Sequence, residues 1–190
     1  MIRFLLLALL LLGARPAGAV MLEMNGVFTQ GGIVMGRTDP GATLTLDGKP
    51  VRVGADGVFV LGFGREAEPT AELSVRGADG SEQRRTLEIA KREYNIQRID
   101  GLPQKYVEPP AEVLARIQRE REQIKKVREI DTERAYFAEG FIWPAKGRIS
   151  GVYGSQRILN GEPKWPHYGI DVAAPVGTPV VAPASGIVRL

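Results

Sequence analysis

Residues 36–61 of this chain read GRTDPGATLTLDGKPVRVGADGVFVL. Within them, TLTL and VRV alternate polar and apolar side chains, a period of two that is typical of a β-strand with one buried face. Asp-Pro-Gly at 39–41 and Asp-Gly at 47–48 and 56–57 separate the apolar runs, and such sequences favour tight turns between antiparallel strands. The stretch therefore predicts consecutive β-hairpins.

The same pattern continues on both sides of this stretch. Short runs rich in Val, Leu, Ile and Phe recur over residues 27–89, with one more Asp-Gly turn at 79–80. About six short strands predict a small antiparallel β-sandwich, which we assign to residues 20–93. The acidic turn residues are interpreted as turn formers rather than calcium ligands, because Asp accepts hydrogen bonds from its own turn and tolerates unusual backbone angles. They are Asp39, Asp47, Asp56 and Asp79.

Residues 36–61 also resemble bacterial immunoglobulin-like or carboxypeptidase-regulatory-like modules. In those modules a Pro-Gly turn leads into a strand, and a later Asp-Gly turn leads into a strand that contains Phe, as Asp56, Gly57 and Phe59 do here. The resemblance covers this stretch only, and it implies a spacing or adhesion role.

The first 19 residues have the pattern of a secretory signal peptide. Arg3 precedes an apolar run at 4–12, and Ala-Gly-Ala at 17–19 supplies the small residues of a cleavage site after Ala19. Only 11 uncharged residues separate Arg3 from Arg15, whereas a membrane-spanning helix needs about 20. An uncleaved membrane anchor is the alternative. We predict a periplasmic or secreted protein without a stable membrane span after cleavage.

Composition and charge limit the chemistry and the partners that this chain can have. The chain has 190 residues, one His and no Cys, so disulfides and thiolate chemistry are excluded. Its net charge is +3, and removal of residues 1–19 with their two arginines leaves 23 basic and 22 acidic residues, a net charge of +1. Such a balance gives no indication of a nucleic-acid partner.

After Tyr94 the composition changes to that of a linker. Gly101 and three prolines precede residues 111–136, which contain neither Gly nor Pro, so we expect a linker at 94–139 with a helix at 111–136. Its apolar residues recur at helical spacing: Val113, Ile117, Ile124, Val127 and Ile130. The intervening residues mix both charges, which indicates a solvated face. We expect the narrow stripe to pack onto a neighbouring domain; a coiled-coil dimer is the weaker alternative, because Glu120 interrupts the stripe.

The candidate chemistry lies in residues 140–190, which are dense in Gly and Pro between short β-type runs. His167 is the only histidine of the chain, and Asp171 follows it at i+4 with Gly169 between them. Neutral imidazole and carboxylate are ordinary zinc ligands, so this pair is a candidate metal site. The alternative is a histidine without a ligand role. Tyr153, Trp165 and Tyr168 are interpreted as packing residues, although aromatic walls beside a metal would also suit a peptide groove.

Several sequence blocks flank this pair in a recognisable order. They are Trp-Pro at 143–144, GRIS at 147–150, Tyr-Gly at 153–154 with Arg157, HYGID at 167–171 and APVGTPVVAPASGIV at 174–188. With them, residues 140–190 resemble the first half of the lysostaphin-type (LytM-like) zinc metallopeptidase domain, a family of cell-wall endopeptidases. The resemblance implies that His167 and Asp171 are zinc ligands and that the substrate is a peptidoglycan peptide. It identifies no catalytic residue in this chain.

In that family, a later H-x-H motif supplies the remaining zinc ligand and a catalytic histidine. No His, Cys, Asp or Glu follows Asp171 here, and residues 180–181 and 186–190 are expected to be strands. We therefore expect a truncated domain that is inactive alone, although a complete but degenerate relative is the alternative explanation. The predicted fold class is mainly β: a small antiparallel β-sandwich, a charged linker helix and a truncated antiparallel β metallopeptidase domain.

The implied function is that of an exported zinc metalloendopeptidase that hydrolyses peptidoglycan peptide cross-links. The alternative is a noncatalytic envelope protein that regulates cell-wall hydrolases, and whose partners are those hydrolases or division proteins. The two differ at His167, because partner binding by a noncatalytic protein should not depend on that side chain.

Overall fold

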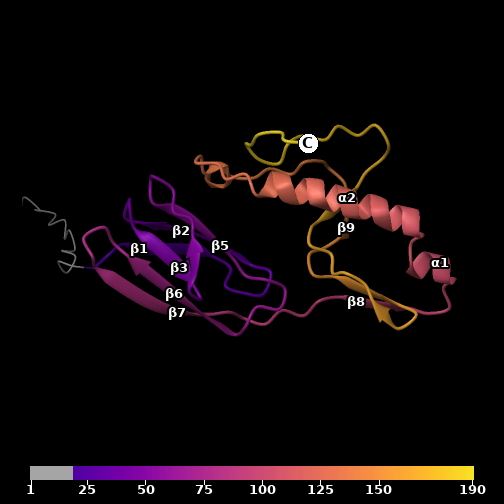
Figure 1. Cartoon of the computed structure of the whole chain (residues 1–190), viewed down its shortest axis with the longest axis horizontal. Coiled ribbons are helices and arrows are strands. Elements are labelled where there is room, and N and C mark those ends of the chain that lie inside the picture. Colours follow the sequence, from indigo (N-terminus) through magenta and orange to yellow (C-terminus); the bar gives the residue numbers. More distant parts are fainter. Residues whose placement is uncertain (1–18) are drawn as a thin grey trace, which may run out of the picture.

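The computed structural model describes residues 19–190, so the predicted signal peptide at 1–19 lies outside the described residues except for Ala19. The fold is mainly β, as predicted, with antiparallel sheets and one long helix. Figure 1 shows a β-sandwich at one end of the molecule and, at the other, the helix α2 together with the strands of the C-terminal part. None of the helices within residues 19–190 has the length and apolar character that crossing a membrane requires.

Two antiparallel sheets form the sandwich, with strand orders β1-β2-β5 and β4-β3-β6-β7. The first contains β1 (Leu22–Gly26), β2 (Ile33–Thr38) and β5 (Val58–Gly62). The second contains β3 (Thr43–Leu46), β4 (Lys49–Val51), β6 (Thr70–Arg76) and β7 (Glu82–Glu88). The turn pattern does not predict β1, because its sequence LEMNG holds no β-branched or aromatic residue.

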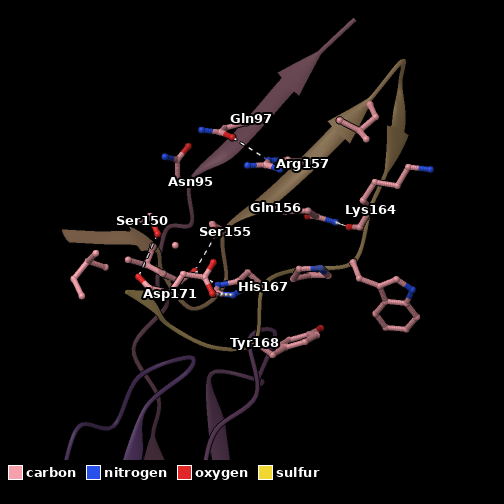
Figure 2. Close-up of a pocket in the computed structure, with 16 residues that line it drawn as sticks. Asn95, Gln97, Ser150, Ser155, Gln156, Arg157, Lys164, His167, Tyr168 and Asp171 are labelled. Carbon is pink, nitrogen blue, oxygen red and sulfur yellow. Dashed lines mark hydrogen bonds and ion pairs between the residues drawn. The ribbon is translucent and has the colours of Figure 1, made fainter. Parts of the chain in front are cut away.

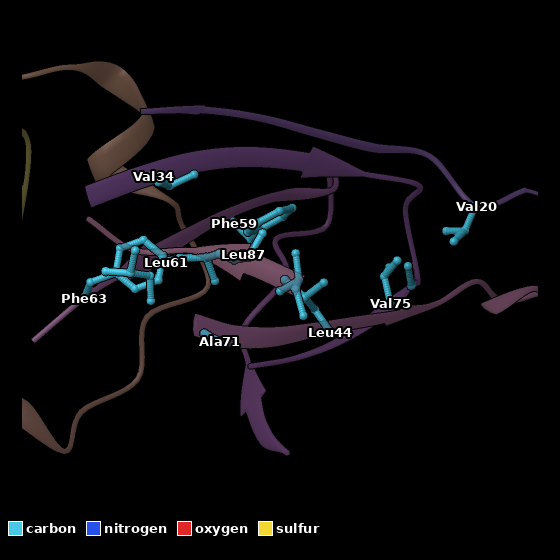
Figure 3. Packing of buried hydrophobic residues seen from close by; sticks show 12 residues of the cluster. Val20, Val34, Leu44, Phe59, Leu61, Phe63, Ala71, Val75 and Leu87 are labelled. Atoms are coloured by element: carbon cyan, nitrogen blue, oxygen red, sulfur yellow. The ribbon is translucent and has the colours of Figure 1, made fainter. Parts of the chain in front are cut away.

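A hydrophobic core fills the space between the two sheets (Figure 3). Alternate residues of β6 are buried, as the period of two requires. Among residues 19–190, the largest fully buried side chains are Val34, Thr38, Phe59, Leu61, Leu73 and Val75. Since burial of one large apolar side chain contributes about 1.5–3 kcal/mol, this core is the main source of stability in the sandwich.

The turn aspartates divide into two groups. The carboxylates of Asp56 and Asp79 accept backbone N–H bonds two residues ahead, from Val58 at 3.2 Å and from Ser81 at 2.9 Å, as predicted for turn formers. Hydrogen bonds from the Ser81 hydroxyl and N–H hold the pKa of Asp79 below its ordinary value. Asp47 has the expected positive φ of 50°, but its carboxylate accepts a bond from a distant N–H in β6. The carboxylate of Asp39 likewise bonds outside its own turn, to the N–H of Met21 at 2.7 Å.

The helix is shorter than predicted. α1 (Gln104–Val107) precedes α2 (Ala111–Arg128), which begins at the expected residue but ends eight residues before position 136, and a 3₁₀ turn, η1 (Tyr136–Glu139), follows. Residues 131–137 instead contact the sandwich: Asp131 pairs with Arg52, and several of these residues line a small cavity with β5. These tertiary contacts override the local preference for helix.

The apolar stripe of α2 is only partly covered. No residue of α2 is buried, and the side chains of Val113 and Ile124 are exposed. Ile117 and Val127 are half-buried. The expected packing onto a neighbouring domain is therefore incomplete within the described residues.

The predicted linker also contributes a strand to the C-terminal part. β8 (Ile96–Ile99) runs parallel to β10 (Gln156–Leu159), and β10 pairs with β11 (Glu162–Pro163). A second small sheet pairs β9 (Arg148–Gly151) with β12 (Asp171–Ala173). Local pattern does not predict β8, because its partner lies 60 residues away in the sequence.

The expected strands at 180–181 and 186–190 are absent, and this prediction is wrong. Residues 174–190 contain no strand, and they form only scattered backbone bonds to residues 142 and 144. Val180 and Val188 are 74% and 91% exposed, because no neighbouring strand lies there to pair with them. The Ser185 hydroxyl and Arg134 lower the pKa of Glu139, so this contact to the tail should weaken as the pH falls through that lowered pKa.

Limited trypsin digestion should cut the second half of the chain first. Both halves contain Lys and Arg, but the sandwich has a closed core, whereas α2 has no buried residue and the tail has no strand. We expect early cuts within residues 116–148 and a resistant fragment covering about residues 20–92. Mass spectrometry of the fragments checks this order. A fragment that keeps residues 140–190 while the sandwich is digested would contradict it.

Candidate functional site

The backbone around His167 folds against the loop between β9 and β10. The N–H of Gly154 donates to the carbonyl of His167 at 2.7 Å, and the N–H of His167 donates to the carbonyl of Ser155 at 2.8 Å. Asp171 begins β12 and lies opposite Gly151 of β9. The two sequence-predicted ligands are thus brought together by sheet pairing and a returning loop, and not by a helical turn, as Figure 2 shows.

His167 faces an oxygen atom at each of its ring nitrogens. Its Nε2 lies 3.2 Å from Oδ1 of Asp171, and its Nδ1 lies 3.3 Å from the carbonyl oxygen of Val152. A neutral imidazole carries one N–H, so it can donate to only one of these oxygens. The other nitrogen then directs a lone pair at an oxygen, and a cation bound by both atoms would remove this repulsion.

The distance between the two donors fits a shared metal ion. Two ligands of one tetrahedral zinc ion, each bound at about 2.0 Å, lie about 3.3 Å apart, and the observed separation is 3.2 Å. Ligand histidines usually donate their other ring N–H to a carbonyl or carboxylate, the role that Val152 can serve here. Within residues 19–190 there is no group of three or more His, Cys, Asp or Glu side chains that could hold a metal ion, so His167 and Asp171 stay a candidate pair.

Gly151 provides the space in which the pair meets. A Cβ at this position would collide with Oδ2 of Asp171 and lie 3.2 Å from Cε1 of His167. The role of Gly151 cannot be predicted from the sequence, because a close approach between residues far apart in the sequence leaves no local signal. The absence of a side chain here is a condition for the observed geometry.

The pair lies in the wall of a cavity of about 580 Å³. Aromatic, amide and basic side chains from β8, β10 and the loops surround it, as Figure 2 shows. Trp165 and Tyr168 are among them, so both rings line the cavity. Tyr153 has the packing role, because its ring lies between those of Tyr94 and Tyr168, with centroids 6.5 and 5.8 Å away.

Gly151→Ala should separate His167 from Asp171. The new methyl group occupies the position of the carboxylate, and overpacking of this kind costs about 1–3 kcal/mol if the pair stays in place. Gly169→Ala is the matched control, because its Cβ would lie 3.9 Å from the His167 ring, an ordinary contact distance. Because the chain has one histidine, its imidazole ¹H–¹⁵N signals report on the site without overlap. We expect these signals to move in Gly151→Ala and to stay nearly unchanged in Gly169→Ala; equal responses would contradict the steric account.

No protein-family model matches the chain, and no curated protein sequence matches it. The resemblance to lysostaphin-type metallopeptidases therefore depends on the sequence blocks of residues 140–190 alone.

Proposed function

We propose that this chain binds zinc and peptidoglycan peptides in the manner of an exported zinc metalloendopeptidase, with His167 and Asp171 as two of the zinc ligands, and that these two ligands alone do not support hydrolysis. The observation that carries the proposal is the 3.2 Å separation of His167 Nε2 and Asp171 Oδ1 in the wall of an open cavity. The order of the flanking sequence blocks supports it independently.

His167 and Asp171 would each contribute one ligand atom to the metal. His167 would bind the metal through Nε2 with its ring proton on Nδ1, where the carbonyl of Val152 can accept it. Asp171 supplies a negative oxygen donor from the first residue of β12, and its side chain is largely exposed, at 62%. A bound zinc ion supplies Lewis acidity and lowers the pKa of a coordinated water.

The cavity offers groups that can bind and orient an extended peptide. Trp165 and Tyr168 provide apolar faces beside the metal ligands, while Asn95 and Gln97 provide amide donors and acceptors. Arg157 contributes a positive charge, and within the described residues it forms no ion pair with a carboxylate. A peptide that carries carboxylate groups, as peptidoglycan peptides do, complements this lining.

Peptide binding tests the proposal. Trp143 and Trp165 are the two tryptophans of the chain, so a Trp143→Phe background leaves Trp165 as the fluorescence reporter in the cavity wall. With zinc present, a soluble peptidoglycan peptide should change this fluorescence saturably, and His167→Ala should weaken the binding by more than about tenfold. Because the described residues supply two protein ligands and hydrolytic zinc sites generally have three, we expect binding without turnover.

Two results would count against the proposal. Peptide binding that is equal in wild type and His167→Ala would favour the noncatalytic envelope protein. If zinc has no effect on peptide binding, a metal ion plays no part in binding the peptide.

A further inference from the structure

We propose that the β-sandwich is part of this site, and that Arg65 is a positioning residue that holds the His167 loop in place. Arg65 follows β5 of the sandwich, whereas its partners belong to the loop before β10 and to β10 itself. The sandwich would then contribute to the alignment of the metal ligands in addition to any spacing or adhesion role.

Arg65 is almost buried between the two parts of the molecule. Its side chain is 10% exposed. The Nε–H donates to the carbonyl of Gly154 at 2.9 Å, and Nη2 lies 3.4 Å from Oε1 of Gln156. Nη1 forms an ion pair with Glu66 at 2.7 Å. A buried guanidinium needs such partners, because an unsatisfied buried charge is costly, so the arrangement fixes the position of the Gly154 carbonyl.

Tyr94 closes the other side of the contact. The Arg65 guanidinium carbon lies 4.6 Å from the centroid of the Tyr94 ring, within the range of a cation–π interaction. A Cβ at Gly154 would collide with the same ring, so the backbone of Gly154 lies directly against Tyr94. The backbone of Gly154 therefore contacts both Arg65 and Tyr94, which lie outside the segment that contains the proposed metal ligands.

Gly154 transmits this constraint to His167. The Gly154 carbonyl is held by Arg65, and the Gly154 N–H donates to the carbonyl of His167 at 2.7 Å. The N–H of His167 in turn donates to Ser155, the next residue. Two consecutive hydrogen bonds thus connect a sandwich side chain to the backbone of the candidate zinc ligand.

Amide hydrogen exchange and histidine NMR on residues 20–190 test this inference without metal. In Arg65→Ala, the Gly154 and His167 amides should exchange about tenfold faster or more, because a hydrogen bond from a charged donor is lost. The His167 imidazole signals at fixed pH should shift, while the core amides of Phe59 and Leu73 keep their protection. Arg84→Ala, at an exposed arginine of β7, is the control and should change none of these signals.

Arg65→Lys is the second variant. It keeps the positive charge and the aliphatic stem, but an ammonium cannot reproduce both the Nε–H bond to Gly154 and the planar contact with Tyr94. We expect faster exchange at Gly154 in this variant as well. If Arg65→Lys leaves the exchange at Gly154 and the His167 signals as in wild type, the inference is overturned.

Zinc titration of the same variants separates this inference from the proposed function, on which the metal-binding part of the inference rests. If wild type binds zinc through His167, Arg65→Ala should weaken zinc binding by about 10–100-fold, as loss of an outer contact typically does. If wild type binds no zinc but Arg65→Ala still shifts the His167 signals, the proposed function fails and the positioning of His167 by Arg65 stands.

Discussion

Phe59→Ala should lower the free energy of unfolding of the sandwich by about 3–5 kcal/mol, the range for large-to-small substitutions of buried phenylalanines. The ring is fully buried between the two sheets (Figure 3). It fills the space above Gly36 of the neighbouring strand β2, where a Cβ would collide with it. Deleting the ring therefore leaves a cavity that the glycine cannot fill.

Val60→Ala on the same strand is the control for Phe59→Ala. Its side chain points outward and is 36% exposed, so its loss should cost less than about 1 kcal/mol. Urea or guanidinium unfolding monitored by circular dichroism measures both variants. Similar losses of stability for Phe59→Ala and Val60→Ala would contradict the core that we describe.

Gly154→Ala should detach the loop of His167 from the sandwich. Gly154 has a φ of 86°, a conformation that costs an L-residue about 1–2 kcal/mol. A methyl group there would also collide with the Tyr94 ring. The ring is held in place by the nearby guanidinium groups of Arg65 and Arg92, so we expect the loop to give way. Hydrogen-exchange mass spectrometry should show faster deuterium uptake over residues 152–168, with little change in the sandwich strands.

Gly161→Ala separates the two causes. Gly161 also has a positive φ, at 81°, but nothing lies within 4 Å of the position of its Cβ. The Gly161→Ala variant places an L-residue at positive φ but causes no collision, so its effect should stay local to the turn between β10 and β11. If Gly161→Ala loosens residues 152–168 as much as Gly154→Ala does, backbone strain and not contact with Tyr94 accounts for the result.

The sandwich could be predicted from the sequence because its information is local. Asp-Gly turns and a period of two occur within a few residues, and the alternating TLTL run coincides with the observed bounds of β3. The end of α2 could not be predicted in this way. No local stop signal precedes position 136, and the chain leaves the helix where Asp131 and its neighbours contact the sandwich.

In the candidate site, too, the residues with a local sequence signal could be predicted and the others could not. His167 and Asp171 lie four residues apart in a distinctive motif, and the structure brings their side chains together. Gly151, Arg65 and Tyr94 act through contacts with residues far away in the sequence, which no spacing rule reveals. The same limit applies to residues 180–190, where apolar runs alone suggest strands but the part of the chain that the structure describes pairs no strand with them.

Zinc titration of residues 20–190 with ¹⁵N-labelled histidine tests whether His167 and Asp171 hold the metal, because every imidazole signal belongs to His167. We expect zinc to shift the Nε2 resonance while Nδ1 keeps its proton, and Asp171→Asn to weaken binding by more than about tenfold. Zinc that leaves the imidazole signals unchanged, or that binds Asp171→Asn as tightly as wild type, would contradict the assignment of His167 and Asp171 as the metal ligands.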